Sequence, residues 1–301
     1  MSHSFMGMPR LQTFQEFGGQ VYTHPYVSQP SYSSSSYYDQ SSDLTLDIWY
    51  PTFIQSLYIL ARTLNIEKTD KTPLAMKTFI NNLFKLVPNA TYRSYLNDFL
   101  MMKPYVVSAI KSTEPNIVNI KPSFDRDVQD MQSIKRFHER SFNNTDGQEM
   151  LFWVYLLDLF MISIMNANQT QTNNPFATVQ RIKPPTLNEI RQKFHPQQTI
   201  TKAMWGNAFW FLIHLTALYA PQPIQVSFDY YKQMLNALRF ILPCVKCRAH
   251  LTNNLHYIDF DTCGKTNEDL FKCSWKLHNI VNKSENKPLM SLQEAFSRYT
   301  F

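Results

Sequence analysis

Glycine is scarce in this sequence, and its scarcity limits the folds that are open to the chain. Only 6 of the 301 residues are glycine, which argues against a glycine-rich nucleotide loop and against a turn-dense β-sandwich. Met, Phe, Leu and Ile instead fill long stretches without glycine, and 44% of the residues are hydrophobic, enough for a packed core. Such a composition favours helices. We therefore expect an all-α protein with room for two modest domains, at roughly 100–200 residues per domain.

Composition divides the chain into four parts. Residues 1–42 are rich in Ser, Tyr and Gln and poor in aliphatic residues, so they cannot bury enough apolar surface to fold alone and predict a disordered arm. Residues 43–168 predict a separate helical domain in which no motif indicates a role. Residues 169–198 are polar and proline-containing, which is typical of a linker. Residues 199–301 predict a second helical domain, and no internal repeat is visible between the two halves.

The first helical domain contains one segment that is apolar enough to suggest a membrane anchor. Residues 150–165 are nearly all apolar, but they number 16 and carry Asp158 near the centre. A membrane-spanning helix needs about 20 apolar residues and rarely tolerates a carboxylate. The sequence therefore favours a buried core helix over a transmembrane segment. Pro51 and Pro104 are expected to end or kink helices of this domain.

The charge of the chain is basic but dispersed. The formal net charge is +6, whereas the lysines and arginines are scattered along the sequence. A binding patch for nucleic acid is marked by clustered charge rather than by net charge, so we expect no nucleic-acid partner. No basic-then-apolar signal peptide opens the sequence, so we do not expect secretion.

All four cysteines fall in the last 60 residues, at 244, 247, 263 and 273. A secreted disulfide scaffold would spread them through the chain. Cys244 and Cys247 form a Cys-x-x-Cys pair, which can close a small disulfide ring, and Pro243 is well placed to begin a helix there. The positive end of that helix would lower the pKa of a thiol in the first turn. Three neighbours add positive charge: Lys246, Arg248 and His250.

A Cys-x-x-Cys pair alone leaves other interpretations open, among them half of a zinc site and a thioredoxin-like motif. The remaining cysteines, Cys263 and Cys273, are too far apart in sequence for the usual pair of zinc knuckles. A thioredoxin-like motif needs a βαβ unit, but residues 228–242 repeat apolar positions at helical spacing.

A second motif lies upstream, where Gly206, Trp210 and His214 are spaced four residues apart and share one face of a helix. A small residue, a flat aromatic ring and a hydrogen-bonding imidazole in one stripe suit a planar cofactor. The alternative is an aromatic stripe that only packs in the core.

A third motif lies downstream, where His278, Asn279 and Asn282 occur in a helix otherwise patterned for burial. Buried polar groups need partners, and a ligand rich in oxygen and ring nitrogen atoms would supply them. Lys283 and Lys287 could reach phosphates. An ordinary helix end with polar residues is the alternative.

These three motifs, in this order and on helices, resemble the Erv/ALR family of FAD-linked sulfhydryl oxidases over about residues 199–298, most closely the versions encoded by large DNA viruses. The resemblance implies a four-helix bundle with a short fifth helix, which holds FAD at one end. It also implies that Cys247 passes electrons to the flavin, that Cys244 exchanges with substrate thiols, and that O2 is reduced to H2O2. The residues that match the family's FAD contacts are Trp210, His214, His278, Asn279, Val281, Asn282 and Lys283, with softer matches at Gly206, Tyr219, His250 and Lys287. No metal ligand is implied.

The sequence departs from the family pattern at two places. Trp275 and Leu292 stand where many cellular members have a cysteine clamp, and the N-terminal arm lacks a shuttle cysteine pair. Cys263 and Cys273 could form a local structural disulfide, which we favour, or act as a shuttle, or stay free. Without a shuttle, we expect a partner's dithiol, such as that of a thioredoxin-like carrier, to react directly with Cys244.

The resemblance also implies a homodimer that serves disulfide formation in virion proteins, in the host cytoplasm or the virion, with the nucleus compatible. Two other functions stay open at this point. One is a structural or assembly protein of a virion that has lost the activity, and the other is a helical binding module stabilised by zinc or disulfides.

Overall fold

The computed structural model describes residues 44–64, 69–143, 147–169, 181–195 and 201–300. The predicted disordered arm, residues 1–42, lies outside these ranges. The described residues form helices and connecting turns, with no strand among them, which confirms the all-α prediction. They belong to one compact unit, residues 38–301.

The helices before residue 194 surround one long apolar helix. The elements of this region are α1 (Leu46–Thr63), α2 (Thr72–Leu86), α3 (Ala90–Leu100), α4 (Pro104–Thr113), α5 (Ile117–Ile120), α6 (Phe124–Asp127), α7 (Met131–Asn143), α8 (Gln148–Gln169) and α9 (Leu187–Lys193). Helix α8 contacts α1, α4, α7 and α9. Its length and hydropathy are those of a membrane-spanning helix, but 72% of its most apolar window is buried in the protein. This burial agrees with the predicted core helix.

Of the two prolines expected to end or kink helices, Pro51 does not end its helix, and Pro104 lies where one helix has ended and the next begins. Pro51 lies inside α1, in its second turn, and α1 continues to Thr63. Pro104 is the first residue of α4. The first turn of a helix has no intrahelical partner for its N–H groups, so proline is well tolerated at this position.

Part of the predicted linker is also a packed helix. Helix α9 begins at a capping box, in which the Thr186 side chain accepts from the Glu189 backbone and the Glu189 carboxylate accepts from the Thr186 backbone. Leu187 and Ile190 are buried. The Phe194 ring stacks on Tyr58 of α1 with 5.0 Å between ring centroids. The prolines of this segment mark the start of a helix rather than a continuous linker.

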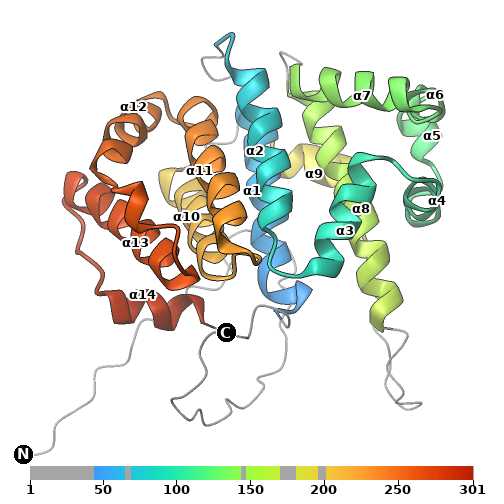
Figure 1. The fold of residues 1–301 in the computed structure, drawn as a ribbon. Helices are drawn as coiled ribbons and strands as arrows, with labels where there is room; N and C mark the ends of the chain where they lie inside the picture. The colour runs from blue at the N-terminus through green and yellow to red at the C-terminus, as the bar shows by residue number, and fades with distance from the viewer. Residues whose placement is uncertain (1–43, 65–68, 144–146, 170–180, 196–200, 301) are drawn as a thin grey trace, which may run out of the picture. The chain divides into compact units, whose positions relative to one another are not determined.

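The C-terminal region is a four-helix bundle with a short fifth helix, as predicted (Figure 1). Its elements are α10 (Lys202–Leu218), α11 (Ile224–Ile241), α12 (Val245–Asn254), η2 (Leu255–Tyr257), η3 (Phe260–Thr262), α13 (Asn267–Ser284) and α14 (Leu292–Tyr299). Helix α10 packs against α11 and α13, helix α12 packs against α11 and α13, and α14 crosses α10 and α13.

The two sets of helices share an interface. Helix α2 lies against α11, and α1 lies against α10. Phe79 of α2 contacts Phe209 of α10, with 6.3 Å between ring centroids. The Lys85 ammonium lies 4.3 Å from the centre of the Tyr230 ring. The helices on the two sides of the boundary that composition predicts therefore pack together in the structure.

Candidate redox site

The Cys-x-x-Cys pair forms a disulfide at the N-terminus of α12. Cys244 is the N-cap residue, and its sulfur accepts a hydrogen bond of 3.2 Å from the backbone N–H of Cys247. Pro243 precedes the cap, so it does not begin the helix as predicted. The cysteine itself occupies the capping position. Both cysteines are half-buried. The N-terminal N–H groups and the helix dipole favour negative charge at these sulfurs, so the arrangement stabilises a thiolate once the disulfide is reduced.

The three positive residues near this pair have different surroundings. Lys246 is exposed and His250 is half-buried. Arg248 is buried, and its Nε donates to the Leu242 carbonyl over 2.7 Å, which ties the start of α12 to the end of α11. Arg248 therefore also fixes the direction in which α12 presents the disulfide.

The upstream and downstream motifs meet at the contact between α10 and α13. The Trp210 ring of α10 stacks on the His278 ring of α13, with 4.0 Å between centroids and 5° between planes. Gly206 lies one turn before Trp210, and a Cβ atom added there would meet no atom within 4 Å. His214 is fully buried behind this stack. Of the three residues in the stripe, Gly206 therefore borders open space, Trp210 is half-buried and His214 lies in the core.

His214 is hydrogen-bonded to His278 and also to Ser274, a residue that the sequence motifs did not include. His214 Nε2 lies 2.8 Å from His278 Nδ1, and His214 Nδ1 lies 2.8 Å from Ser274 Oγ. Burial lowers the pKa of His214 well below its usual value. Burial, with Lys287 and Arg298 nearby, lowers the pKa of His278 to about 4. Both rings are therefore neutral at pH 7. No sequence pattern singles out Ser274, although it lies four residues before His278 on α13.

Two of the predicted cofactor residues are used by the protein itself. The Asn279 amide donates to the Met290 carbonyl and accepts from the Met290 N–H, at 2.8 and 3.0 Å. The Tyr219 hydroxyl donates to the Tyr299 carbonyl over 3.1 Å. Asn279 therefore holds the segment before α14, and Tyr219 holds the last residue of α14. Their role as cofactor contacts stays a prediction.

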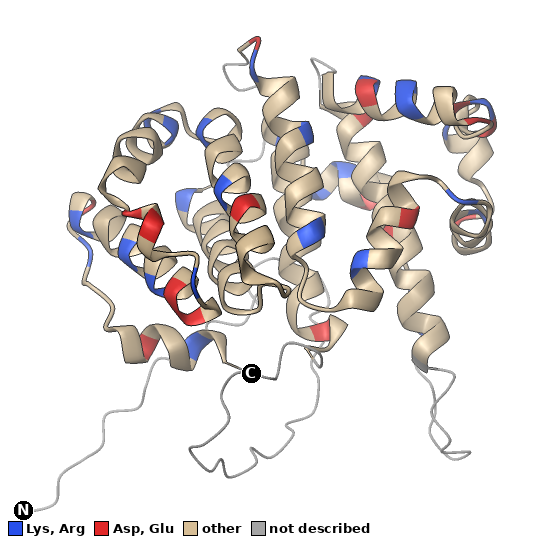
Figure 2. Cartoon of the chain, in the orientation of Figure 1, with Lys and Arg blue, Asp and Glu red and all other residues tan. Residues whose placement is uncertain are grey.

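Three of the remaining predicted residues lie in the last turn of α13, and Lys287 follows the end of this helix. Val281 and Asn282 are half-buried, and Lys283 and Lys287 are exposed. Lysine, arginine, aspartate and glutamate are otherwise scattered over many of the helices, with both signs present on each side of the molecule in this view (Figure 2). This distribution agrees with the dispersed charge inferred from the sequence.

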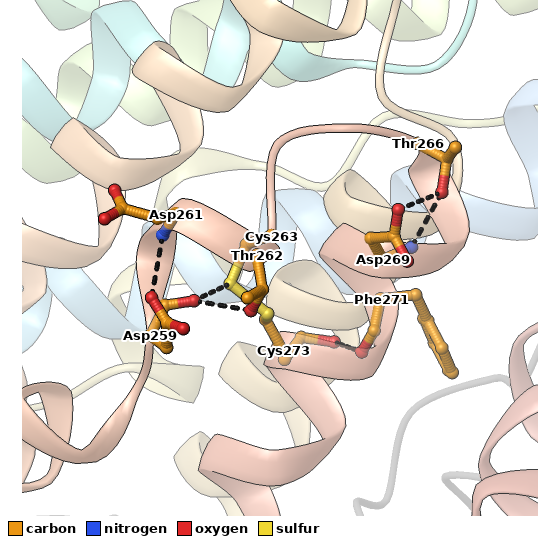
Figure 3. The surroundings of a disulfide bond; sticks show 9 residues. Asp259, Asp261, Thr262, Cys263, Thr266, Asp269, Phe271 and Cys273 are labelled. Atoms are coloured by element: carbon orange, nitrogen blue, oxygen red, sulfur yellow. Dashed lines mark hydrogen bonds between the residues drawn. A yellow bond between two sulfur atoms is a disulfide. The ribbon is translucent and has the colours of Figure 1, made fainter.

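The other two cysteines form a second disulfide, which joins the turn after η3 to α13 (Figure 3). Cys263 is fully buried and Cys273 is 6% exposed. The Cys263 sulfur also lies 3.1 Å from the Asp259 carbonyl. Of the three states considered for these cysteines, the structure shows the disulfide-bonded one.

A zinc module would require cysteine and histidine side chains to converge. The cysteines instead pair two by two in separate disulfides. No group of three or more His, Cys, Asp or Glu side chains within the described ranges could hold a metal ion. The arrangement offers paired sulfurs for redox exchange rather than four ligands for one ion.

The donor set around the stack fits a planar dinucleotide. The paired Trp210 and His278 rings are only partly buried, and such flat surfaces suit stacking. The space beside Gly206 admits a ring close to the backbone. Lys283 and Lys287 can bind phosphates as point charges. FAD meets each of these requirements.

A helical bundle that carries a Cys-x-x-Cys disulfide at a helix N-terminus defines a thiol–disulfide redox protein. Comparison with known proteins points to a family for this region: residues 207–300 match the model of the Erv1 / Alr family.

Relatives occur in viruses and in plants. A putative FAD-linked sulfhydryl oxidase of Invertebrate iridescent virus 3 is 29% identical over 34% of this chain and 69% of its own length. A probable FAD-linked sulfhydryl oxidase of Acanthamoeba polyphaga mimivirus is 32% identical over 30% of this chain and 65% of its own length. An FAD-linked sulfhydryl oxidase of Oryza sativa subsp. japonica is 25% identical over 37% of this chain and 57% of its own length. The chain thus spans about two thirds of the viral relatives, and no solved structure matches it.

Proposed function

We propose that this protein is an FAD-dependent sulfhydryl oxidase that converts protein dithiols to disulfides. The observation that carries the proposal is the Cys244–Cys247 disulfide at the N-terminus of α12, in the same bundle as the Trp210–His278 stack. Thiol exchange needs an accessible disulfide whose sulfurs are stabilised as thiolates when they leave, and the helix N-terminus provides that stabilisation.

The exchange begins at Cys244. A substrate thiolate attacks the Cys244 sulfur, forms a mixed disulfide and releases Cys247 as a thiolate. The second substrate thiolate then attacks the mixed disulfide, which yields the substrate disulfide and leaves Cys244 reduced. Bound FAD would supply the two-electron oxidation that restores the Cys244–Cys247 disulfide, with O2 as the final acceptor and H2O2 as the product. Trp210, His278, Asn282, Lys283 and Lys287 are the residues proposed to hold it.

The proposal extends to the partners of the enzyme. The substrates are protein dithiols, including that of a thioredoxin-like carrier, since both cysteines of the second disulfide are buried away from partners. The enzyme is a homodimer that serves disulfide formation in virion proteins, in the host cytoplasm or nucleus or in the virion. The similarity to sulfhydryl oxidases of two large DNA viruses supports this setting.

The decisive experiment is an absorbance spectrum of the purified protein with oxygen consumption driven by dithiothreitol, for wild type and Cys247→Ala. We expect a bound flavin in both proteins and oxygen uptake that falls at least ~10³-fold in the variant, because removal of a residue that acts in covalent exchange eliminates the step. Trp210→Ala should instead lose the flavin peak. A colourless wild type, or unchanged uptake in Cys247→Ala, would overturn the proposal.

A further inference from the structure

Ser274, His214 and His278 form a continuous hydrogen-bonded row from the core of the bundle to the Trp210 stack. Ser274 is buried on α13, and its Oγ lies 2.8 Å from His214 Nδ1. His214 Nε2 lies 2.8 Å from His278 Nδ1. Each inner nitrogen of the row therefore faces one partner, while His278 Nε2 is the nitrogen at the outer end.

The hydrogens in this row have a direction, which the Phe271 carbonyl determines. Ser274 Oγ lies 2.6 Å from this carbonyl oxygen. A carbonyl can only accept, so the single hydroxyl hydrogen of Ser274 points to it. Ser274 Oγ must then act as an acceptor toward His214, which places a hydrogen on His214 Nδ1.

The direction passes from one imidazole to the next. A neutral imidazole carries one N–H, so His214 Nε2 is an acceptor and His278 Nδ1 must donate to it. His278 is itself neutral at pH 7, because burial and the nearby Lys287 and Arg298 lower its pKa. Its Nε2 therefore carries a lone pair. The hydrogen bonds of the row therefore select the His278 tautomer that carries its hydrogen on Nδ1.

We infer that Ser274 and His214 are positioning residues that fix His278 in the tautomer with an Nε2 acceptor, and that this nitrogen binds an N–H or O–H group of the flavin nucleotide. The identity of the ligand rests on the proposed function, whereas the tautomer rests on the row alone. The stack with Trp210 fixes the plane of the His278 ring. Ser274, acting through His214, fixes which nitrogen of that ring carries the hydrogen.

The test is ¹⁵N-histidine NMR of the full chain together with flavin titration. In wild type, both His214 and His278 should be protonated at Nδ1. In Ser274→Ala the acceptor is lost, so we expect His214 to donate from Nε2 and His278 to carry its hydrogen on Nε2. Flavin affinity should then fall about 10-fold, as for one lost hydrogen bond.

Two further variants separate this role from a structural one. Ser284 lies on the same helix and also donates to a carbonyl three residues earlier, that of Val281, but it is exposed and outside the row. Ser284→Ala should leave the NMR signals and the affinity unchanged, and Ser274→Thr should restore both. Wild-type His278 protonated at Nε2, or unchanged signals in Ser274→Ala, would overturn the inference. The predicted tautomers in a protein that binds no flavin would overturn the proposed function and the ligand assignment, but not the row.

Discussion

Asp158 is a buried carboxylate on the apolar helix α8. Its two oxygens accept hydrogen bonds from the hydroxyls of Tyr50 and Tyr58, at 2.8 and 2.9 Å. The residue is only 6% exposed. Burial raises the pKa of Asp158 to about 6, although the two tyrosines oppose this shift. The protonated form is thus favoured by the fold.

This shift gives a prediction for stability against pH. Since the folded pKa exceeds the unfolded value of about 3.9, the folded state binds the proton more tightly. The resulting stabilisation is full below pH 4 and is lost as pH rises to about 6. We expect Asp158→Asn to be more stable than wild type at pH 7.5, by up to ~3 kcal/mol, and to show little gain at pH 4. Urea unfolding at the two pH values measures the difference.

Asp98 provides the control of opposite sign. Burial acts against its charge, but hydrogen bonds from Lys103 and Tyr105 hold its pKa below the usual value. Asp98→Asn should therefore lose stability at pH 7.5, and the loss should shrink as pH falls. Equal effects of both substitutions at both pH values would contradict the assigned pKa shifts.

Trp210, His214 and His278, which the sequence named as candidates, meet in the structure, and their role as cofactor contacts stays a prediction. The spacing of Trp210, His214 and His278 placed them on facing helices, because helical periodicity is local. It could not show that His214 is covered or that Asn279 bonds to Met290, since both depend on contacts between distant segments. Ser274 was missed because a lone serine in an apolar helix has no distinctive pattern.

At the scale of the elements, the second disulfide links the η3 turn to the second turn of α13. The turn is also held by hydrogen bonds from Asp261 and Thr262 to Asp259 and by contact of the Phe260 ring with Phe228. The disulfide is buried and lies apart in sequence from the redox pair. We therefore expect it to stabilise the turn rather than to carry electrons.

We expect the double variant Cys263→Ala/Cys273→Ala to unfold about 2–4 kcal/mol more easily, because the disulfide no longer restricts the unfolded chain. Its flavin content and its thiol-driven oxygen uptake at low temperature should match wild type. Cys244→Ala/Cys247→Ala is the matched control, with uptake abolished and stability changed less. Lost uptake in a Cys263/Cys273 variant that keeps its flavin would show that this pair acts as a shuttle.

The elements were predicted where a local signal dominates. Apolar periodicity and scarce glycine gave the helices of the bundle and the buried α8. Proline was less informative: α1 continues past Pro51, and the prolines before α9 were assigned to a linker. Proline disrupts the interior of a helix but is favourable near its start. The sequence signal is the same in both cases, and only the position relative to the helix start separates them.

At the scale of the whole molecule, α1 and α2 cover faces of α10 and α11. The contact combines the Phe79–Phe209 ring pair with cation–π contacts of Lys71 and Lys85 to Phe240 and Tyr230. Composition could not reveal this interface, because an apolar helix face does not show whether it packs within its own domain or against another. Its consequence is that the fold of the redox bundle depends on the helices before it.

This dependence predicts one cooperative unfolding transition, with the flavin released at the same temperature. Phe137 is fully buried on α7, which contacts α2 and α8 rather than the bundle. Phe137→Ala leaves a cavity that costs about 3–5 kcal/mol, so we expect it to lower both the melting temperature and the temperature of flavin release by roughly 6–20 °C. Phe79→Ala, at the interface itself, should lower both as well. Calorimetry with flavin fluorescence measures the two temperatures. Flavin release at the wild-type temperature in Phe137→Ala, preceded by a separate earlier transition, would show that the two sets of helices unfold independently and that the interface couples them only weakly.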